Sequence, residues 1–341
     1  MTLYPLLMAP YFRHGAQTPW GGDALRDMLM KPAPEQTGES LEVSTLEGME
    51  SVVRNGAHAG QSFRRVFEQW SSALTGTDDA VFPLMLKLLD ARTFLSVQVH
   101  PDDAYAAREG KLGKTEAWMI LSCDSGAKIA YGMDANAAPA KLFASGDAAA
   151  IEAAVRWKTV RPGDVYYMPA GMLHALGAGI LAYEIQQSSD VTYRVWDWGR
   201  LGKDGQPREL HIQQAIDVVR PELQLEKVYG ATSLCRGGSR TYYVCNRYFE
   251  MCRLNISGRM PLSDGRMHFV TPLAPCRLTW GDEALELNPF DTVVIPAALE
   301  DVTIECDGGD GKALMSSTSN REALRAELGY RAENVAGLCE E

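Results

Sequence analysis

The stretch FLSVQVHPDD at residues 94–103, followed by GKTE at residues 113–116, decides the fold more than any other part of the sequence. Successive side chains of a β-strand point to opposite faces, so Ser96, Gln98 and His100 share one face. The aliphatic residues between them share the other face. A polar row that ends in an imidazole and is backed by aliphatic side chains is typical of a strand that presents a metal site inside a barrel.

Glu116 follows a turn-rich segment and begins an apolar run at residues 117–121. A hairpin at this turn brings its carboxylate back beside His100, and an imidazole and a carboxylate are two typical zinc ligands. The alternative is that His100 is a capped histidine of the core and Glu116 a solvated strand end. Residues 94–116 alone leave both interpretations open.

A second histidine follows the segment VRPGDVYYMPA at residues 160–170. Pro-Gly-Asp is a turn signal, the next residues form a strand, and Pro169 ends it, so His174 stands where a new strand begins. With the three earlier donors, His174 completes a set of nitrogen and oxygen ligands that suits zinc or another borderline divalent ion. Gln98 is the weakest member, because it could instead support a neighbouring ligand.

Two further strands are expected in ILAYEIQQSSDVTYRVWDWGR, at residues 180–200. The first carries Glu184 and the second Arg194. An inward guanidinium needs an anionic partner because a buried unpaired charge is costly. Arg194 therefore either serves an anionic ligand or pairs structurally with Asp190 or Asp197.

The sequence resembles the type I phosphomannose isomerases of the short bacterial kind, which belong to the cupin superfamily. The resemblance is good over the first two thirds of the chain and weak over the last third. Leu41 stands where the family usually has Trp, and residues 14–19 look like an insertion. Five segments match in chain order: WGG at 20–22, GESLEVS at 38–44, SVQVHPDD at 96–103, GKTEAW at 113–118 and the block 162–200.

The resemblance implies roles for individual residues. The catalytic arginine of the family falls on Arg194, and Glu184 is a candidate for proton transfer, with a water molecule at the metal as the alternative. Lys114 is a candidate for phosphate binding or ring opening. Ser96 is a candidate for substrate contact, although a structural hydroxyl is an equal alternative. The zinc ligands of the family fall on Gln98, His100, Glu116 and His174.

Composition excludes several classes of function. The chain has 341 residues, a net charge of −11 and a pI of about 5.1. Such an acidic protein repels nucleic-acid phosphates. An anionic sugar phosphate would need local positive charge, which Lys114, Arg194 and zinc would supply. We expect no signal peptide and no membrane span. Seven cysteines without regular spacing predict reduced thiols and a cytoplasmic protein.

Short alternating segments separated by Gly, Pro and Asp predict a mainly β fold, and the resemblance implies two cupin-type jelly-roll barrels with a few inserted helices. We expect a catalytic N-terminal domain at residues 1–230 and a metal-free C-terminal domain at 231–341. Helices are expected at 60–74, 137–157 and 210–219, and the best linker at 221–238.

An internal echo supports two barrels. The segment VRPGDVYYMPA at 160–170 is echoed by LNPFDTVVIPA at 287–297, with Pro, Asp, Pro and Ala at equal spacing. His174 lies four residues after the first copy and Asp301 four residues after the second. We therefore expect equivalent hairpins, of which only the first serves a metal. Coincidence between two hairpins with common turn residues is the alternative.

The resemblance implies a zinc-dependent isomerase, with one zinc ion per chain, that interconverts mannose 6-phosphate and fructose 6-phosphate through an enediol. Two alternatives remain. The first is a cupin metal-dependent oxygenase, because two imidazoles and a carboxylate also bind Fe(II). The second is a non-catalytic cupin that binds a sugar phosphate. The sequence leaves monomer and homodimer equally open.

Overall fold

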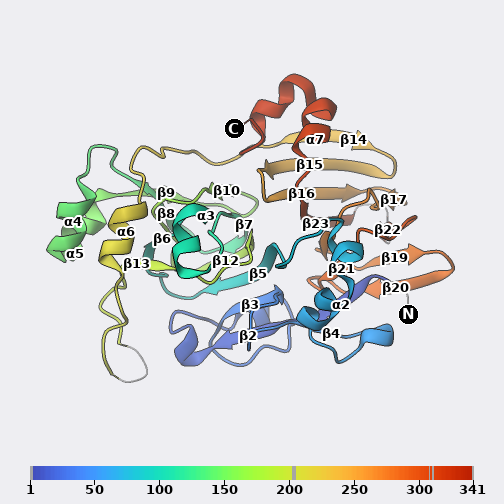
Figure 1. Ribbon diagram of the computed structural model, residues 1–341, viewed down its shortest axis with the longest axis horizontal. Coiled ribbons are helices and arrows are strands. Elements are labelled where there is room, and N and C mark those ends of the chain that lie inside the picture. The colour runs from blue at the N-terminus through green and yellow to red at the C-terminus, as the bar shows by residue number, and fades with distance from the viewer. Residues whose placement is uncertain (1–2, 202–204, 307, 309–310, 340–341) are drawn as a thin grey trace. The chain divides into compact units, whose positions relative to one another are not determined.

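The computed structural model describes residues 3–201, 205–306, 308 and 311–339. The chain divides into two compact units. The site unit contains residues 12–40 and 87–227, and the second unit contains the residues up to 11, 41–86 and those from 228 onwards. The boundaries at 40 and 86 fall inside strands β3 (Thr37–Val43) and β5 (Leu84–Ala91), which are labelled in Figure 1. The expected domains 1–230 and 231–341 stay a prediction.

Two antiparallel sheets build the site unit. The six-stranded sheet has the order β10 (Val165–Met168), β7 (Glu116–Cys123), β12 (Ile180–Gln187), β5 (Leu84–Ala91), β3 (Thr37–Val43) and β2 (Tyr11–His14). The five-stranded sheet has the order β13 (Tyr193–Trp196), β6 (Val97–Val99), β11 (His174–Ala175), β8 (Lys128–Met133) and β9 (Val155–Thr159).

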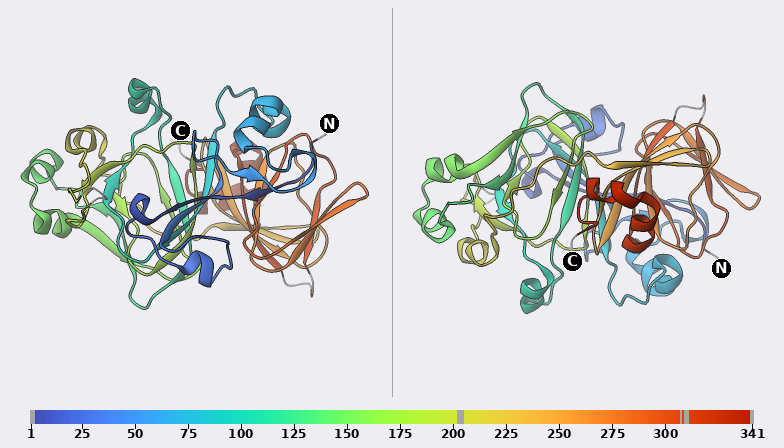
Figure 2. Two further views of the ribbon diagram at one scale, coloured as in Figure 1. Left: turned by 90° about the horizontal axis from the view of Figure 1, so that it is seen from below. Right: turned by 90° about the horizontal axis from the view of Figure 1, so that it is seen from above.

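The second unit also has two sheets, and Figure 2 shows its yellow-to-red strands wrapping into a barrel. The eight-stranded sheet has the order β14 (Ala231–Cys235), β15 (Gly238–Cys245), β16 (Phe249–Ile256), β23 (Gly311–Thr318), β18 (His268–Pro272), β21 (Val293–Ile295), β1 (Leu6–Ala9) and β4 (Val52–Val53). The four-stranded sheet has the order β17 (Met260–Pro261), β22 (Thr303–Cys306), β19 (Cys276–Trp280) and β20 (Glu283–Leu287).

The two units share one strand order. The order β10-β7-β12-β5-β3-β2 matches β21-β18-β23-β16-β15-β14, and the order β6-β11-β8-β9 matches β17-β22-β19-β20. Corresponding strands follow one another in the same sequence along the chain. The echo at 160–170 and 287–297 provides β10 and β21, which take equivalent places. The fold class is therefore confirmed as mainly β, with two cupin-type jelly-roll barrels and a few inserted helices.

Helices connect the strands. The helix expected at 60–74 is α2 (Phe63–Thr75), which Ser62 caps by accepting from Arg65 N and which ends at Gly76 with φ +81°. The other helices are α1 (Ala24–Asp27), α3 (Asp103–Ala106), α4 (Pro139–Ser145), α5 (Ala148–Ala154), α6 (Ile212–Val218) and α7 (Arg321–Leu328), with 3-10 turns at Gly15–Gln17, Gly56–His58, Ala107–Glu109 and Gly329–Asn334.

Two local expectations are wrong. Residues 155–157 continue as strand β9 rather than as helix, because this segment pairs with β8 instead of extending α5. The expected linker at 221–238 contains β14, which forms an edge of the eight-stranded sheet. Both segments are short, and their pairing partners decide their conformation more than their own composition does.

Cysteine usage also differs from expectation. Cys276 and Cys306 are paired residues on the neighbouring strands β19 and β22, with Cα atoms 4.2 Å apart, and they form a disulfide. The expectation of reduced thiols is therefore wrong for these two. The free cysteines among the described residues are Cys123, Cys235, Cys245, Cys252 and Cys339. None of the described helices is both long and apolar enough to cross a membrane.

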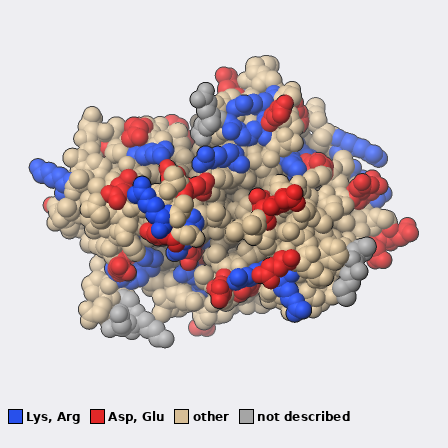
Figure 3. Space-filling model, in the orientation of Figure 1, with Lys and Arg blue, Asp and Glu red and all other residues tan. Residues whose placement is uncertain are grey.

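The surface agrees with the mixed charge of the sequence. Figure 3 shows Lys and Arg side chains interspersed with Asp and Glu over the face in view, without one broad area of either sign.

Several of the buried residues are charged, and in the site unit they include Glu39, Lys87, Lys114, Glu116 and Glu184. A charge is buried in a folded protein only when it has partners. These residues therefore point to the functional site.

Candidate metal centre and active site

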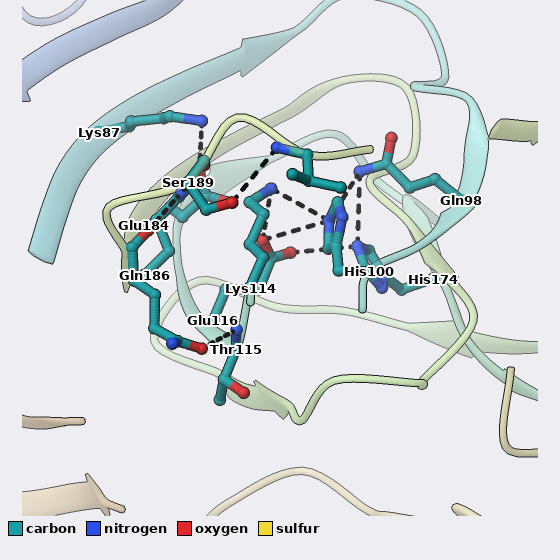
Figure 4. A network of polar contacts seen from close by, with 12 residues as sticks. Lys87, Gln98, His100, Lys114, Thr115, Glu116, His174, Glu184, Gln186 and Ser189 are labelled. Carbon is teal, nitrogen blue, oxygen red and sulfur yellow. Dashed lines mark hydrogen bonds and ion pairs between the residues drawn. The ribbon is translucent and has the colours of Figure 1, made fainter. Parts of the chain in front are cut away.

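Three predicted ligands meet in the interior of the site unit. The ligand atoms of His100, Glu116 and His174 all lie within 4.8 Å of one another, and each side chain is buried. His100 Nε2 is 3.5 Å from Glu116 Oε2, and His174 Nε2 is 3.1 Å from Glu116 Oε1. Figure 4 shows the two imidazoles and the carboxylate directed at a common point. This arrangement of two nitrogens and one carboxylate could hold a divalent metal.

Local structure explains the convergence. His174 pairs with Gln98 across β11 and β6, so both lie at the same level of the five-stranded sheet. The chain then returns through α3 and a turn to place Glu116 at the start of β7. At this turn Lys114 N donates to Pro101 O at 2.9 Å. Only glycine fits at position 113, because a Cβ there would lie 2.6 Å from the Asp102 carbonyl carbon.

Gln98 completes the group. Its amide nitrogen lies 3.5 Å from His100 Nε2 and 3.4 Å from His174 Nε2, and its oxygen accepts from Ser96 Oγ at 3.0 Å. The amide oxygen is the metal-binding atom of glutamine, and a half-turn of the amide would exchange the two. Ser96, a candidate for substrate contact, therefore supports Gln98.

The donors fit a metal on their own chemistry. Both oxygens of buried Glu116 lack a regular hydrogen bond among the described residues. His174 Nδ1 lies 2.8 Å from Met172 O. A carbonyl can only accept, so Nδ1 carries the proton and Nε2 directs a lone pair at the centre. Of the two, Oε1 faces the His174 lone pair and Oε2 has the Lys114 ammonium beside it, and a carboxylate oxygen facing an imidazole lone pair suits a divalent cation.

Charge fixes the protonation of this group. Burial and the ammonium of Lys114 hold the pKa of His100 well below its usual range. Burial alone would raise the pKa of Glu116, but Lys114 and the two imidazoles outweigh it and hold that pKa well below its usual range. The set is therefore a neutral imidazole beside a carboxylate, which are the forms that bind metal.

Lys114 contacts the cluster of Gln98, His100, Glu116 and His174, which we call the metal group. Its Nζ is 2.8 Å from Glu116 Oε2 and 3.0 Å from His100 Nε2, and its side chain is buried. The predicted candidate for phosphate binding or ring opening is thus within hydrogen-bond distance of two ligands. It places positive charge directly beside two of the candidate ligands.

Glu184 lies on β12, next to the strand of Glu116. Trp118 Nε1 donates to its Oε1 at 2.8 Å, and Lys87 Nζ is 3.3 Å from its Oε2. Burial raises the pKa of Glu184, while Lys87 opposes the rise. A buried carboxyl with a raised pKa beside a metal group is suited to general acid–base chemistry near neutral pH.

Arg194 takes its place on β13, paired with Gln98 of β6. Its Nε has no hydrogen-bond partner among the described residues, and burial with the nearby Arg208 lowers its pKa. The aspartates proposed as its structural partners are engaged elsewhere: Asp197 pairs with Arg208 at 2.6 Å and Asp190 with Lys111 at 3.4 Å. Asp197 also acts on Arg194 through its charge, so the choice between a structural partner and an anionic ligand stays a prediction.

Sequence reasoning missed Lys87 and Glu39. Lys87 lies in β5, within the otherwise apolar run LMLKLL at residues 84–89, and it also lies 3.7 Å from Glu39 Oε2. A lone lysine in a buried strand was the available signal, because such a charge must be paired. The identity of its partners depends on neighbouring strands far apart in sequence.

Comparisons with known proteins point to one family. Residues 13–123 match the family model for the catalytic domain of type I phosphomannose isomerase. The chain is 36% identical over 290 residues to a mannose-6-phosphate isomerase of Streptococcus mutans, covering 82% of this chain and 90% of that protein. It is 33% identical over 310 residues to mannose-6-phosphate isomerase ManA of Bacillus subtilis, covering 89% and 97%.

Structural similarity leads to the same family. A crystal structure of mannose 6-phosphate isomerase from Bacillus subtilis superposes with a TM-score of 0.85 at 33% identity, covering 92% of this chain and 99% of that one. A phosphomannose isomerase from Salmonella typhimurium, at 15% identity and a TM-score of 0.74, shares the fold. Identity above 30% over most of both chains establishes common membership. The chain belongs to the type I phosphomannose isomerase family.

Proposed function

We propose that this protein interconverts mannose 6-phosphate and fructose 6-phosphate with one zinc ion per chain. The observation that carries the proposal is the buried Glu116 carboxylate, whose two oxygens face the imidazole nitrogens of His100 and His174 at 3.5 and 3.1 Å. Gln98, through its amide oxygen, is the proposed fourth ligand. The relatives named mannose-6-phosphate isomerase support this substrate.

Isomerisation moves a proton from C2 of the aldose to C1 of the ketose through an enediol. When bound, zinc would supply a Lewis acid that stabilises the developing negative charge on the substrate oxygen. Glu184 is the proposed base at C2 and acid at C1. Its raised pKa supports this role, because a carboxyl closer to neutrality both accepts and returns a proton readily.

Cationic side chains would hold the anionic substrate. Arg194 offers a guanidinium with a free Nε among the described residues, and donors aimed at developing charge are often the largest catalytic term. Lys114 is held at the metal group by Glu116 and His100, so we assign it to the sugar oxygens rather than to the phosphate. Lys114 is buried and Arg194 is half-buried, and charge interactions strengthen where water is excluded.

In the second unit, His268 takes the position that corresponds to Glu116 of the site unit. Glu116 pairs with Met168 of β10, and His268 pairs with Ile295, the residue that takes the place of Met168 in the echo. His268 is bound to Ser317 Oγ at 2.6 Å and to Asp264 Oδ1 at 2.9 Å. We infer that this unit binds no catalytic metal, because that position is occupied by a closed polar network.

A coupled assay tests the proposal. Zinc-loaded protein is expected to form fructose 6-phosphate from mannose 6-phosphate, and to form none from unphosphorylated mannose at the same concentration. Oxygen uptake with Fe(II)-loaded protein in place of isomerisation would favour the oxygenase alternative. Binding of mannose 6-phosphate without turnover by the zinc-loaded protein would favour a non-catalytic sugar-phosphate-binding protein.

A further inference from the structure

A row of three buried charges and one half-buried charge crosses the six-stranded sheet from the metal group to its edge. Neighbouring strands β12, β5, β3 and β2 contribute in turn Glu184, Lys87, Glu39 and Arg13. Lys87 Nζ is 3.3 Å from Glu184 Oε2 and 3.7 Å from Glu39 Oε2, and Arg13 Nη1 is 3.0 Å from Glu39 Oε2. The signs alternate along the row, so each inner charge has an opposite charge on both sides.

Glu39 is the buried carboxylate of this row without a role in the chemistry proposed above. It is 9% exposed, and no metal ligand or substrate-facing group touches it in the polar contacts of the described residues. Burial alone would raise its pKa, but Lys87 and Arg13 outweigh burial and keep the pKa below its usual value. Glu39 is therefore a buried carboxylate held charged by two cations, one of which also faces Glu184.

The consequence concerns the position of the Lys87 ammonium. Lysine has a flexible stem and a point charge, so its ammonium moves to its strongest partner. With one carboxylate available, a buried ammonium closes to a hydrogen bond of about 2.8 Å. With carboxylates on both sides, the ammonium stays between them. Figure 4 shows the Lys87 side chain directed toward Glu184.

We propose that Glu39, braced by Arg13, is a positioning residue that draws the Lys87 ammonium away from Glu184 and so leaves the Glu184 carboxylate free to accept the substrate proton. The proposal rests on the proposed function for its effect on catalysis, because Glu184 acts there as the base. Of the charged groups that act on Glu184, Lys87 is the one with an ion pair to Glu39 among the described residues, while Lys114 acts on both carboxylates through its charge without such a pair.

The test compares Glu39→Gln with wild type in the zinc-loaded protein. We expect kcat to fall by about 10- to 100-fold with KM nearly unchanged, because an ammonium closer to Glu184 makes that carboxylate a weaker base and leaves the contacts to substrate as they were. Zinc content should stay near wild type, while loss of the two ion pairs of Glu39 should lower Tm as in the control below. Glu39→Asp keeps the charge and should recover most of kcat. Wild-type kcat in Glu39→Gln would overturn the proposal.

Glu250→Gln is the matched control. Glu250 is a buried carboxylate of the second unit that pairs with Arg266 at 3.1 Å. This change should lower Tm and leave kcat per folded protein unchanged. If Glu39→Gln instead behaves like Glu250→Gln, losing Tm but not kcat, Glu39 is only a structural residue and the proposal fails.

Crystal structures of wild type and Glu39→Gln separate this inference from the proposed function. We expect Lys87 Nζ to close from 3.3 Å to about 2.8 Å from Glu184 Oε2 in the variant. An unchanged or longer separation would contradict the inference even if the enzyme isomerises mannose 6-phosphate. Closure of the pair in a protein that turns over no sugar phosphate would support the positioning and contradict the proposed function alone.

Discussion

Lys87 Nζ and Glu184 Oε2 face each other at 3.3 Å across the neighbouring strands β5 and β12 of the site unit. Both side chains are buried. Burial raises the pKa of Glu184 and Lys87 opposes that rise. Burial would lower the pKa of Lys87, but Glu39 and Glu184 outweigh it and raise that pKa. The ammonium therefore stays charged while the carboxyl is poised to exchange a proton.

The first prediction concerns the pH dependence of isomerisation. Only the deprotonated Glu184 accepts a proton, so kcat/KM should fall as pH decreases, with an acid limb above the ordinary glutamate value of 4.5. Lys87→Met removes the cation that lowers this pKa, so the limb should move to higher pH. Lys158→Met, at a surface lysine paired with Glu226, should leave the limb in place. A limb that moves to lower pH in Lys87→Met would contradict the assignment.

The second prediction concerns the metal. His100→Ala and His174→Ala should each lose most of the bound zinc, because each removes one of few ligands. Elemental analysis of the purified proteins measures the loss. His268→Ala is the control, since His268 is an equally buried imidazole in the second unit. Two folded ligand variants that retain full zinc would show that the metal group is wrongly identified.

Arg194 gives the third prediction. Arg194→Ala should lower kcat by about 100- to 1,000-fold, because a donor to a developing oxyanion is lost, while zinc stays near one ion per chain. Steady-state kinetics and elemental analysis on the same sample test this. A structural arginine would behave in the opposite way, with a much lower Tm and a near-normal kcat.

The fourth prediction concerns how acid changes the stability of the second unit. Burial alone would raise the pKa of Asp264, but the His268 hydrogen bond and Arg266 outweigh it, so that the pKa lies below the ordinary value of 3.8. A lowered carboxyl pKa stabilises the fold above that ordinary value, and the stabilisation is lost as pH falls through the folded-state value.

Asp264→Asn should therefore lower Tm most near neutral pH, and the difference from wild type should shrink at about pH 3. Thermal denaturation of both proteins at the two pH values measures it. Kinetics of Asp264→Asn near neutral pH provide the control, because kcat of the folded variant should equal that of wild type. A difference in Tm that grows in acid would mean that Asp264 does not stabilise the fold as a carboxylate.

The metal group was predictable because its signals are local. Alternation along one strand places Gln98 and His100 on one face, and turn residues place Glu116 and His174 at the starts of new strands. The segments 94–116 and 160–174 carry this information within themselves. The echo likewise predicted equivalent strands, because the same turn chemistry flanks β10 and β21.

Other features depend on which strands become neighbours. The partners of Lys87 are 48 residues before it and 97 after it, so no local pattern identifies Glu39 and Glu184. Cys276 and Cys306 lie 30 residues apart and meet only because β19 pairs with β22. His268 takes the place of Glu116 through strand register, which the sequence around His268 does not reveal.

The most direct test of the metal-dependent isomerase is removal and return of zinc during turnover of mannose 6-phosphate. Chelator-treated wild type should form no fructose 6-phosphate, and one equivalent of zinc should restore its rate. Chelated His174→Ala should not regain activity with the same zinc. Full isomerase activity in protein shown by elemental analysis to hold no metal would contradict the account.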